Sequence, residues 1–186
     1  MAALMWVSEI VDTATGHELD QYGIVPRTDD GLAGIATSPF LHLGFGHLIG
    51  NTIPFVAMGC VIALSGLKRV AMVTAVVAVV GGFGTWLFSP ANVNVIGASG
   101  IVFGYAAYLL ARGFFSRAAS HFLVGVFVIV LWGGALLGGL VPQEGISWQA
   151  HFFGALGGVL AAALVGPQRK KGGMSRSSSE ISSELR

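Results

Sequence analysis

Charged residues are scarce in this 186-residue sequence. Only 10% of the residues are charged, 54% are hydrophobic, and the mean hydropathy is +0.76. Soluble domains carry roughly a quarter charged residues, and a water-soluble fold of this length could not bury so much apolar surface. The net charge of +1 gives no electrostatic reason to expect nucleic acid as a partner. The composition therefore predicts an all-α polytopic membrane protein in a lipid bilayer.

Cysteine is almost absent as well. The single cysteine, Cys60, lies in an apolar stretch and has no second cysteine with which to form an internal disulfide. It is typical of a small hydrophobic residue in the core or facing lipid. Because there is no Cys/His cluster, we expect neither a metal nor a cofactor.

Five apolar segments approach the roughly 20 residues that a spanning helix needs. They cover residues 48–64, 70–88, 96–110, 122–140 and 148–165, each bounded by turn residues or charges. Residues 1–7 are apolar but too short to span. We interpret residues 2–11 as the end of a first helix that begins upstream, which would give six spans. The alternative is a peptide that lies in the membrane interface.

The sequence divides into three parts. Residues 1–46 contain the N-terminal stub and a mixed segment (13–46) that is too polar to span and must rely on protein to satisfy its backbone groups. Residues 47–167 form the transmembrane core. Residues 168–186 are serine-rich and predict a disordered tail.

Basic residues gather at alternate connections between the spans. They are Lys68, Arg69, Arg112, Arg117, Arg169, Lys170 and Lys171. The loops 89–94 and 142–147 contain no lysine or arginine. The positive-inside rule therefore places the basic connections and the C-terminus in the cytoplasm, and the other loops outside.

Four polar residues stand out at the outer ends of the spans: His47, Asn51, Ser99 and His151. Polar side chains inside spans are costly and call for a reason. His47 and Asn51 are four positions apart and share one helix face. They could hydrogen-bond neighbouring helices, or they could both donate to a developing oxyanion.

Ser99 lies within Gly97-Ala98-Ser99-Gly100, where glycine allows a sharp turn and close approach of a substrate. Such a motif also fits simple helix packing. His151 could bridge helices or relay protons, but it could also serve as the base that a serine nucleophile requires. That role needs the two helices to touch.

Small residues make such contact between the two helices possible. Gly100 and Gly104 share one face of the third span, and Gly154 and Gly158 share one face of the fifth. Small residues at four-residue spacing allow close packing of membrane helices.

Taken together, these motifs resemble the rhomboid family of intramembrane serine proteases over residues 22–165. The matching residues are His42, His47-Leu48-Ile49-Gly50-Asn51, Gly97-Ala98-Ser99-Gly100 and Ala150-His151-Phe152-Phe153-Gly154-Ala155-Leu156-Gly157. The resemblance implies a rhomboid-like helical bundle with five complete spans and the stub of a first helix. It also implies that residues 13–46 form the external loop, which lies partly in the membrane.

The resemblance implies a role for each site residue. Ser99 would be the nucleophile and His151 the general base, without an acidic third member, and none of the five spans contains an Asp or Glu. The remaining roles concern the oxyanion and the shape of the site. His47, Asn51 and the Ser99 backbone N–H would bind the oxyanion, Gly97 would let the backbone approach the substrate, and His42 would shape and hydrate the site.

The implied activity is cleavage of other membrane proteins in or near a transmembrane segment. The resemblance also implies a prokaryotic plasma membrane, with the site near its outer side and no cofactor. An alternative is an inactive member that acts as a membrane chaperone or binding module. A small transporter or proton channel is the other alternative, and it would predict internal repeats and acidic residues in the spans.

Two positions depart from the family pattern. Some members carry a Trp-Arg pair in the external loop, where this chain has Ala33 and Gly34, so the loop is expected to be held differently. Some members have a tyrosine that packs on the catalytic histidine. Phe103 occupies that place here, and it should keep the ring contact and the activity while losing the hydroxyl.

Overall fold

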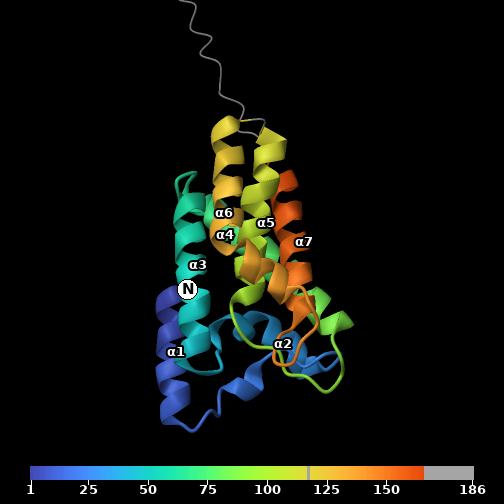
Figure 1. The fold of residues 1–186 in the computed structure, drawn as a ribbon. Coiled ribbons are helices and arrows are strands. Elements are labelled where there is room, and N and C mark those ends of the chain that lie inside the picture. The colour runs from blue at the N-terminus through green and yellow to red at the C-terminus, as the bar shows by residue number, and fades with distance from the viewer. Residues whose placement is uncertain (117, 166–186) are drawn as a thin grey trace, which may run out of the picture.

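The computed structural model describes residues 1–116 and 118–165 (Figure 1). Within these residues the chain forms seven α-helices and two short 3₁₀ helices. In chain order they are α1 (Ala2–Ala14), η1 (Asp20–Tyr22), α2 (Asp29–Thr37), η2 (Ser38–Phe40), α3 (Gly44–Ala63), α4 (Leu67–Phe88), α5 (Ser99–Ser116), α6 (Ala119–Gly139) and α7 (Trp148–Leu164).

The five predicted spans correspond to helices α3 to α7, which confirms the membrane helical bundle. By length and composition, α3, α4 and α6 could each cross a membrane, and α7 is a shorter apolar helix. Helix α5 runs to Ser116, six residues beyond its predicted end, so Arg112 lies inside this helix and not in a loop. An arginine is tolerated there because its stem can pack on apolar groups while its charged head reaches outward. The predicted tail and Arg117 lie outside the described residues.

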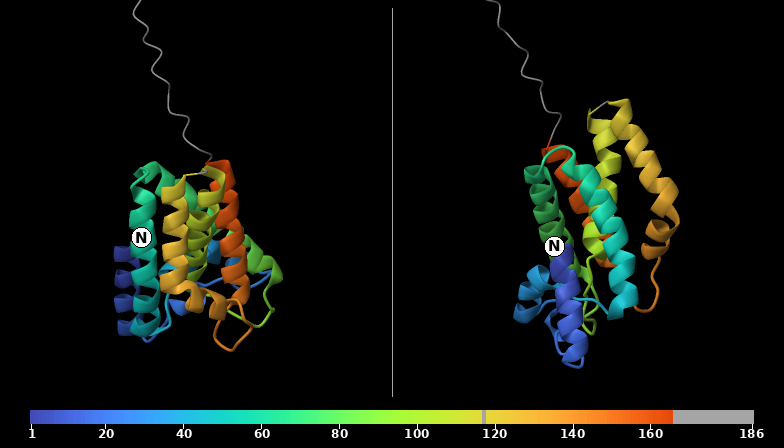
Figure 2. Two further views of the ribbon diagram at one scale, coloured as in Figure 1. Left: turned by 45° about the horizontal axis from the view of Figure 1, so that its top comes forward. Right: turned by 90° about the vertical axis from the view of Figure 1, so that its left-hand side faces the viewer.

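Helix α5 is the centre of the bundle. It packs against α3, α4, α6 and α7, and its buried side chains include Tyr105 and Tyr108. Helix α6 lies at the edge of the bundle, next to α5 (Figure 2). A central helix contacts mostly protein, so its own sequence can be less apolar than that of a lipid-facing helix.

The predicted contact between the two glycine faces is confirmed. A Cβ added to Gly154 would lie 2.1 Å from the Gly100 carbonyl oxygen, and one added to Gly158 would lie 2.0 Å from the Gly104 carbonyl oxygen. Backbone therefore meets backbone between α5 and α7. This contact brings the N-terminal ends of the two helices together.

Helix α1 confirms the helix expected over residues 2–11 and extends it to Ala14. It lies alongside the first half of α3 (Figure 1). Met5 is fully buried and packs with Leu48, and the Trp6 indole N–H donates to the Thr52 hydroxyl at 3.2 Å. A helix packed in this way is not a peptide that lies separately in the interface.

The segment between α1 and α3 packs against other parts of the protein, as was predicted from its polarity. Helix α2 packs on α4, and a Cβ at Gly31 or Gly34 would collide with the backbone of residues 23–25. The Arg27 guanidinium donates to the carbonyls of Leu87 (3.0 Å) and Ser89 (2.7 Å). These contacts hold a loop that has Ala33 and Gly34 in place of a Trp-Arg pair.

Candidate active site

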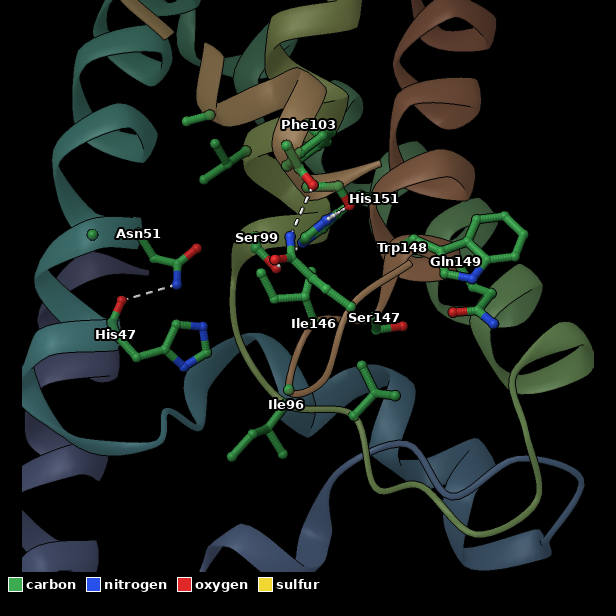
Figure 3. Close-up of a pocket in the computed structure, with 18 of the residues that line it drawn as sticks. His47, Asn51, Ile96, Ser99, Phe103, Ile146, Ser147, Trp148, Gln149 and His151 are labelled. Atoms are coloured by element: carbon green, nitrogen blue, oxygen red, sulfur yellow. Dashed lines mark hydrogen bonds between the residues drawn. The ribbon is translucent and has the colours of Figure 1, made fainter. Parts of the chain in front are cut away.

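Ser99 and His151 meet at the helix ends that the glycines bring together. Ser99 is the first residue of α5, and His151 lies in the first turn of α7. The Ser99 Oγ and the His151 Nε2 are 2.8 Å apart (Figure 3). This is a hydrogen-bond distance between a hydroxyl and an imidazole nitrogen.

The other nitrogen of His151 fixes which atom carries the proton. The His151 Nδ1 lies 2.7 Å from the Gly139 carbonyl oxygen. Because a carbonyl only accepts, Nδ1 must donate, and a neutral ring then has a free lone pair on Nε2. The Ser99 hydroxyl can donate to that lone pair, which is the arrangement that a general base needs.

The Phe103 ring holds the imidazole from one side. Its ring and that of His151 are parallel within 1°, with centroids 4.0 Å apart. This confirms the expected contact at the position where some rhomboids have tyrosine. A Cβ at Gly139 would lie 2.6 Å from Phe103 and 2.8 Å from the His151 Nδ1. The His151 ring is thus confined by Phe103 and by the absence of a side chain at Gly139.

His47 and Asn51 lie across the cavity on α3 (Figure 3). The Leu43 N–H donates to the His47 Nδ1 at 3.2 Å, so in the neutral ring Nε2 carries the proton and is a donor. The Asn51 amide donates one N–H to the His47 carbonyl at 3.0 Å and keeps a second N–H. Both side chains therefore retain a donor.

Gly97 allows the turn into α5. Its φ of +116° is a conformation that favours glycine, and a Cβ there would lie 2.8 Å from the His47 ring. Its N–H donates to the Ser38 carbonyl at 2.8 Å, which attaches the turn to η2. The Gly97 backbone thus supports the position of Ser99 and leaves room for His47.

His42 lies behind the site and does not line the cavity. Its side chain is buried, and its Nε2 accepts from the Ala98 N–H at 3.4 Å. Its ring meets that of His47 at a centroid distance of 5.1 Å. Burial, followed by the proximity of His47, lowers the pKa of His42 from 6.5 to about 4. His42 is thus a neutral support for the residue before Ser99.

A cavity of about 990 Å³ contains Ser99, His151, His47 and Asn51. Its walls come from α3, α5, α6 and the start of α7, and from the loops before α5 and α7. Much of its lining is apolar, including Trp132, Leu136 and Trp148. Such a space can hold an extended apolar segment beside the hydroxyl of Ser99.

Sequence reasoning missed two features of this end of the molecule. One is Gly139, whose carbonyl orients His151; nothing in the glycine-rich end of the sixth helix singles it out. The other is that Glu9 and Asp12 are buried in α1. Neither takes the place of an acidic third member, because the His151 Nδ1 binds a carbonyl.

Comparison with known proteins agrees with this geometry. Residues 29–168 match the family described as the Rhomboid domain, which is most of the chain. The chain belongs to the rhomboid family.

Relatives within bacteria extend this finding. The chain is 40% identical over 183 residues to the uncharacterized protein Rv1337 of Mycobacterium tuberculosis, covering 94% of this chain and 76% of that protein. It is 42% identical over 180 residues to the uncharacterized protein ML1171 of Mycobacterium leprae, covering 90% and 70%. Rhomboid protease GluP of Bacillus subtilis is 29% identical over 133 residues, which is 71% of this chain and 26% of that protein.

Proposed function

We propose that this rhomboid is an intramembrane serine endopeptidase that cleaves other membrane proteins in or near a transmembrane segment. The 2.8 Å contact between the Ser99 Oγ and the His151 Nε2 carries the proposal. It is supported by the Gly139 carbonyl, which leaves Nε2 as the acceptor. The name of the relative GluP points to the same activity.

The chemistry follows the geometry. The Ser99 oxygen attacks the carbonyl carbon of the substrate while the His151 Nε2 takes the hydroxyl proton. His151 then gives that proton to the leaving amine as the peptide C–N bond breaks, and an acyl ester remains on Ser99. Water, deprotonated by the same nitrogen, then attacks the ester. The bond to the Ser99 oxygen breaks, this oxygen regains the proton from His151, and the new carboxyl end is released.

The negative charge of the tetrahedral intermediate requires donors. The N–H of Ser99 is at the first turn of α5, where backbone N–H groups have no partner within the helix. Together with the His47 Nε2–H and the free amide N–H of Asn51, it would form the oxyanion hole. Gly97 and His42 would act indirectly, through the backbone that leads into Ser99.

The substrate class follows from the cavity and the membrane. An α-helix hides its peptide bonds, so a transmembrane substrate must unwind locally before Ser99 can reach a carbonyl carbon. The apolar lining suits such a segment better than it suits a charged soluble peptide.

The charge pattern supports an orientation in the membrane. Lys68, Arg69 and Arg112 lie at the end of the bundle away from Ser99, which favours a cytoplasmic position for that end. The active site would then lie near the outer side of a prokaryotic plasma membrane. Residues 1–46 would form the N-terminal helix and the external loop, residues 47–167 the catalytic core, and residues 168–186 a cytoplasmic tail.

The proposal is tested by cleavage of a model transmembrane substrate in proteoliposomes. Ser99→Ala and His151→Ala should each abolish the cleavage that the parent chain performs. Ser120→Ala, an exposed serine at the start of α6, should cleave like the parent. Equal cleavage by Ser99→Ala would remove the nucleophile. A folded parent chain without cleavage would favour an inactive member that only binds membrane proteins.

A further inference from the structure

A second polar cluster lies at the C-terminal end of α1, and its residues do not line the cavity at Ser99. Asp12, His17 and Asp20 each bring one potential ligand atom to within 4.8 Å of the others. The His17 Nδ1 is 2.9 Å from one Asp12 oxygen, and the other Asp12 oxygen accepts the Leu19 N–H at 2.7 Å. The chain turns back after α1 through positive φ angles at Gly16 and His17, and this turn places His17 beside Asp12.

Glu9 is a further buried carboxylate near this cluster, although it is not one of the three residues whose ligand atoms meet. It precedes Asp12 by three positions, so both lie on one face of α1, and its side chain is 1% exposed. Among the residues that the structure describes, neither carboxylate oxygen of Glu9 has a hydrogen-bond partner, and the same is true of the Asp20 Oδ1. The Gly44 N–H lies beside Glu9 but donates to the His42 carbonyl at 3.0 Å.

The cluster has an excess of negative charge. The titratable side chains near the Glu9 carboxylate are those of Asp12, Asp20 and His17. In the described part of the chain, the only basic side chain within 4.0 Å of these carboxylates is His17, whose Nδ1 contacts Asp12. Buried carboxylates without a positive partner are costly, and a bound cation would remove that cost.

We propose that Asp12, His17 and Asp20, with Glu9 beside them, bind a divalent transition-metal ion. An imidazole nitrogen combined with carboxylate oxygens suits zinc or manganese, whereas calcium takes oxygen ligands. Zinc should bind more tightly than manganese, following the usual order of divalent ions. The His17 side chain is 53% exposed, which gives an ion a path from solvent.

The sequence alone did not predict this site. The three proposed ligands and Glu9 are spread over positions 9 to 20 without a recognisable metal-ligand spacing. Only the turn through Gly16 and His17 brings them together.

The site is linked to the proposed active site through the backbone. The Asp20 carbonyl accepts the Asn94 side-chain amide at 2.7 Å, and Ile24 pairs with Val95 through two backbone hydrogen bonds (2.9 and 3.0 Å). The segment 94–98 leads directly into Ser99. A metal ion would therefore fasten α1 to the loop that supports this segment, and we expect it to stabilise the fold.

The test uses the full chain without an affinity tag, purified in detergent and freed of metal with a chelator. Zinc is titrated against a chromophoric competitor, and thermal unfolding is followed in parallel. We expect one zinc ion per chain. At free zinc a hundred times the dissociation constant, the unfolding midpoint should rise by roughly 5–10 °C.

Three variants locate the ion. His17→Ala changes a half-exposed side chain and should fold, yet it should weaken zinc binding by at least about tenfold. Asp20→Asn should do the same. Glu18→Gln is the matched control, because Glu18 is an exposed neighbour of His17 outside the cluster, and it should bind zinc like the parent.

Several results would overturn the proposal. One is the absence of stoichiometric zinc binding. Another is unchanged zinc affinity in His17→Ala, which would place the ion elsewhere, for example at the His42 and His47 rings. Calcium that stabilises the parent and His17→Ala equally would also contradict the mixed ligand set. None of these readouts depends on protease activity, so the metal site and the proposed function can fail separately.

Discussion

At the scale of single residues, the absence of a side chain at Gly139 leaves just enough room for the His151 ring. A methyl group at this position would collide with the ring. Gly139→Ala would place a Cβ 2.8 Å from the His151 Nδ1 and 2.6 Å from Phe103. We expect the ring to move away from Ser99, and cleavage to fall by roughly 100-fold, because small misplacements of reacting groups are costly. The measurement is the rate of cleavage of a model transmembrane substrate.

Another glycine of α6 provides the control for this prediction. A Cβ added to Gly134 would meet no atom within 4 Å, and Gly134 does not line the cavity, so Gly134→Ala should cleave like the parent. Equal activity of the two variants would show that the His151 ring is not confined in this way.

The lowered pKa of His42 predicts that the stability of the folded chain depends on pH. Its pKa is about 4 in the folded chain and near 6.5 when unperturbed, so the unfolded chain binds more protons between these values. Stability from this group is therefore present above pH 6.5 and lost as the pH falls towards 4. The loss is about 3 kcal/mol at most, from 1.36 kcal/mol for each pKa unit.

This prediction is checked by measuring unfolding midpoints in detergent between pH 7 and pH 4. His42→Gln removes the titrating ring and should show a shallower fall than the parent over this window. Parallel curves for the two proteins would mean that His42 is not responsible.

At the scale of elements, the contact between α5 and α7 positions the dyad. Gly154→Ala would place a Cβ 2.1 Å from the Gly100 carbonyl oxygen, which is backbone and cannot rotate away. The helices must separate, and we expect a loss of about 1–3 kcal/mol in the free energy of unfolding. Denaturant titration in detergent measures it.

A glycine on α6 is the matched control. A Cβ added to Gly134 would meet no atom within 4 Å, and Gly134→Ala should be neutral or stabilise the helix slightly. If Gly154→Ala were as stable as Gly134→Ala, the close approach of α5 and α7 would not hold.

The helices were largely predictable from the sequence, because runs of apolar residues and their bounding turns are local features. The ends of the helices were less predictable. Arg112 suggested the end of a span, but this residue lies inside α5. The glycine faces of α5 and α7 were also predictable, since their spacing is a local property. The role of Gly139 and the burial of Glu9 could not be predicted from the sequence, because both depend on which segments meet in three dimensions.

At the scale of the whole molecule, the charge pattern predicts which loops face outward. After replacement of Cys60 by serine, single cysteines at Ala91 and Gln143 should react with a membrane-impermeant maleimide in intact cells. Cysteines at Leu64 and Ser120, at the opposite end of the bundle, should react only after the membrane is opened. All four positions are exposed on the protein. The reverse pattern of labelling would invert the orientation.

The central claim is that His151 activates Ser99 as a nucleophile. The most direct test is covalent labelling with a fluorophosphonate, followed by mass spectrometry of the modified peptide, because it needs no knowledge of the substrate. We predict one adduct per chain on Ser99, and at least about 100-fold slower labelling of His151→Ala. An adduct on another serine, or labelling of His151→Ala at the parent's rate, would contradict the account.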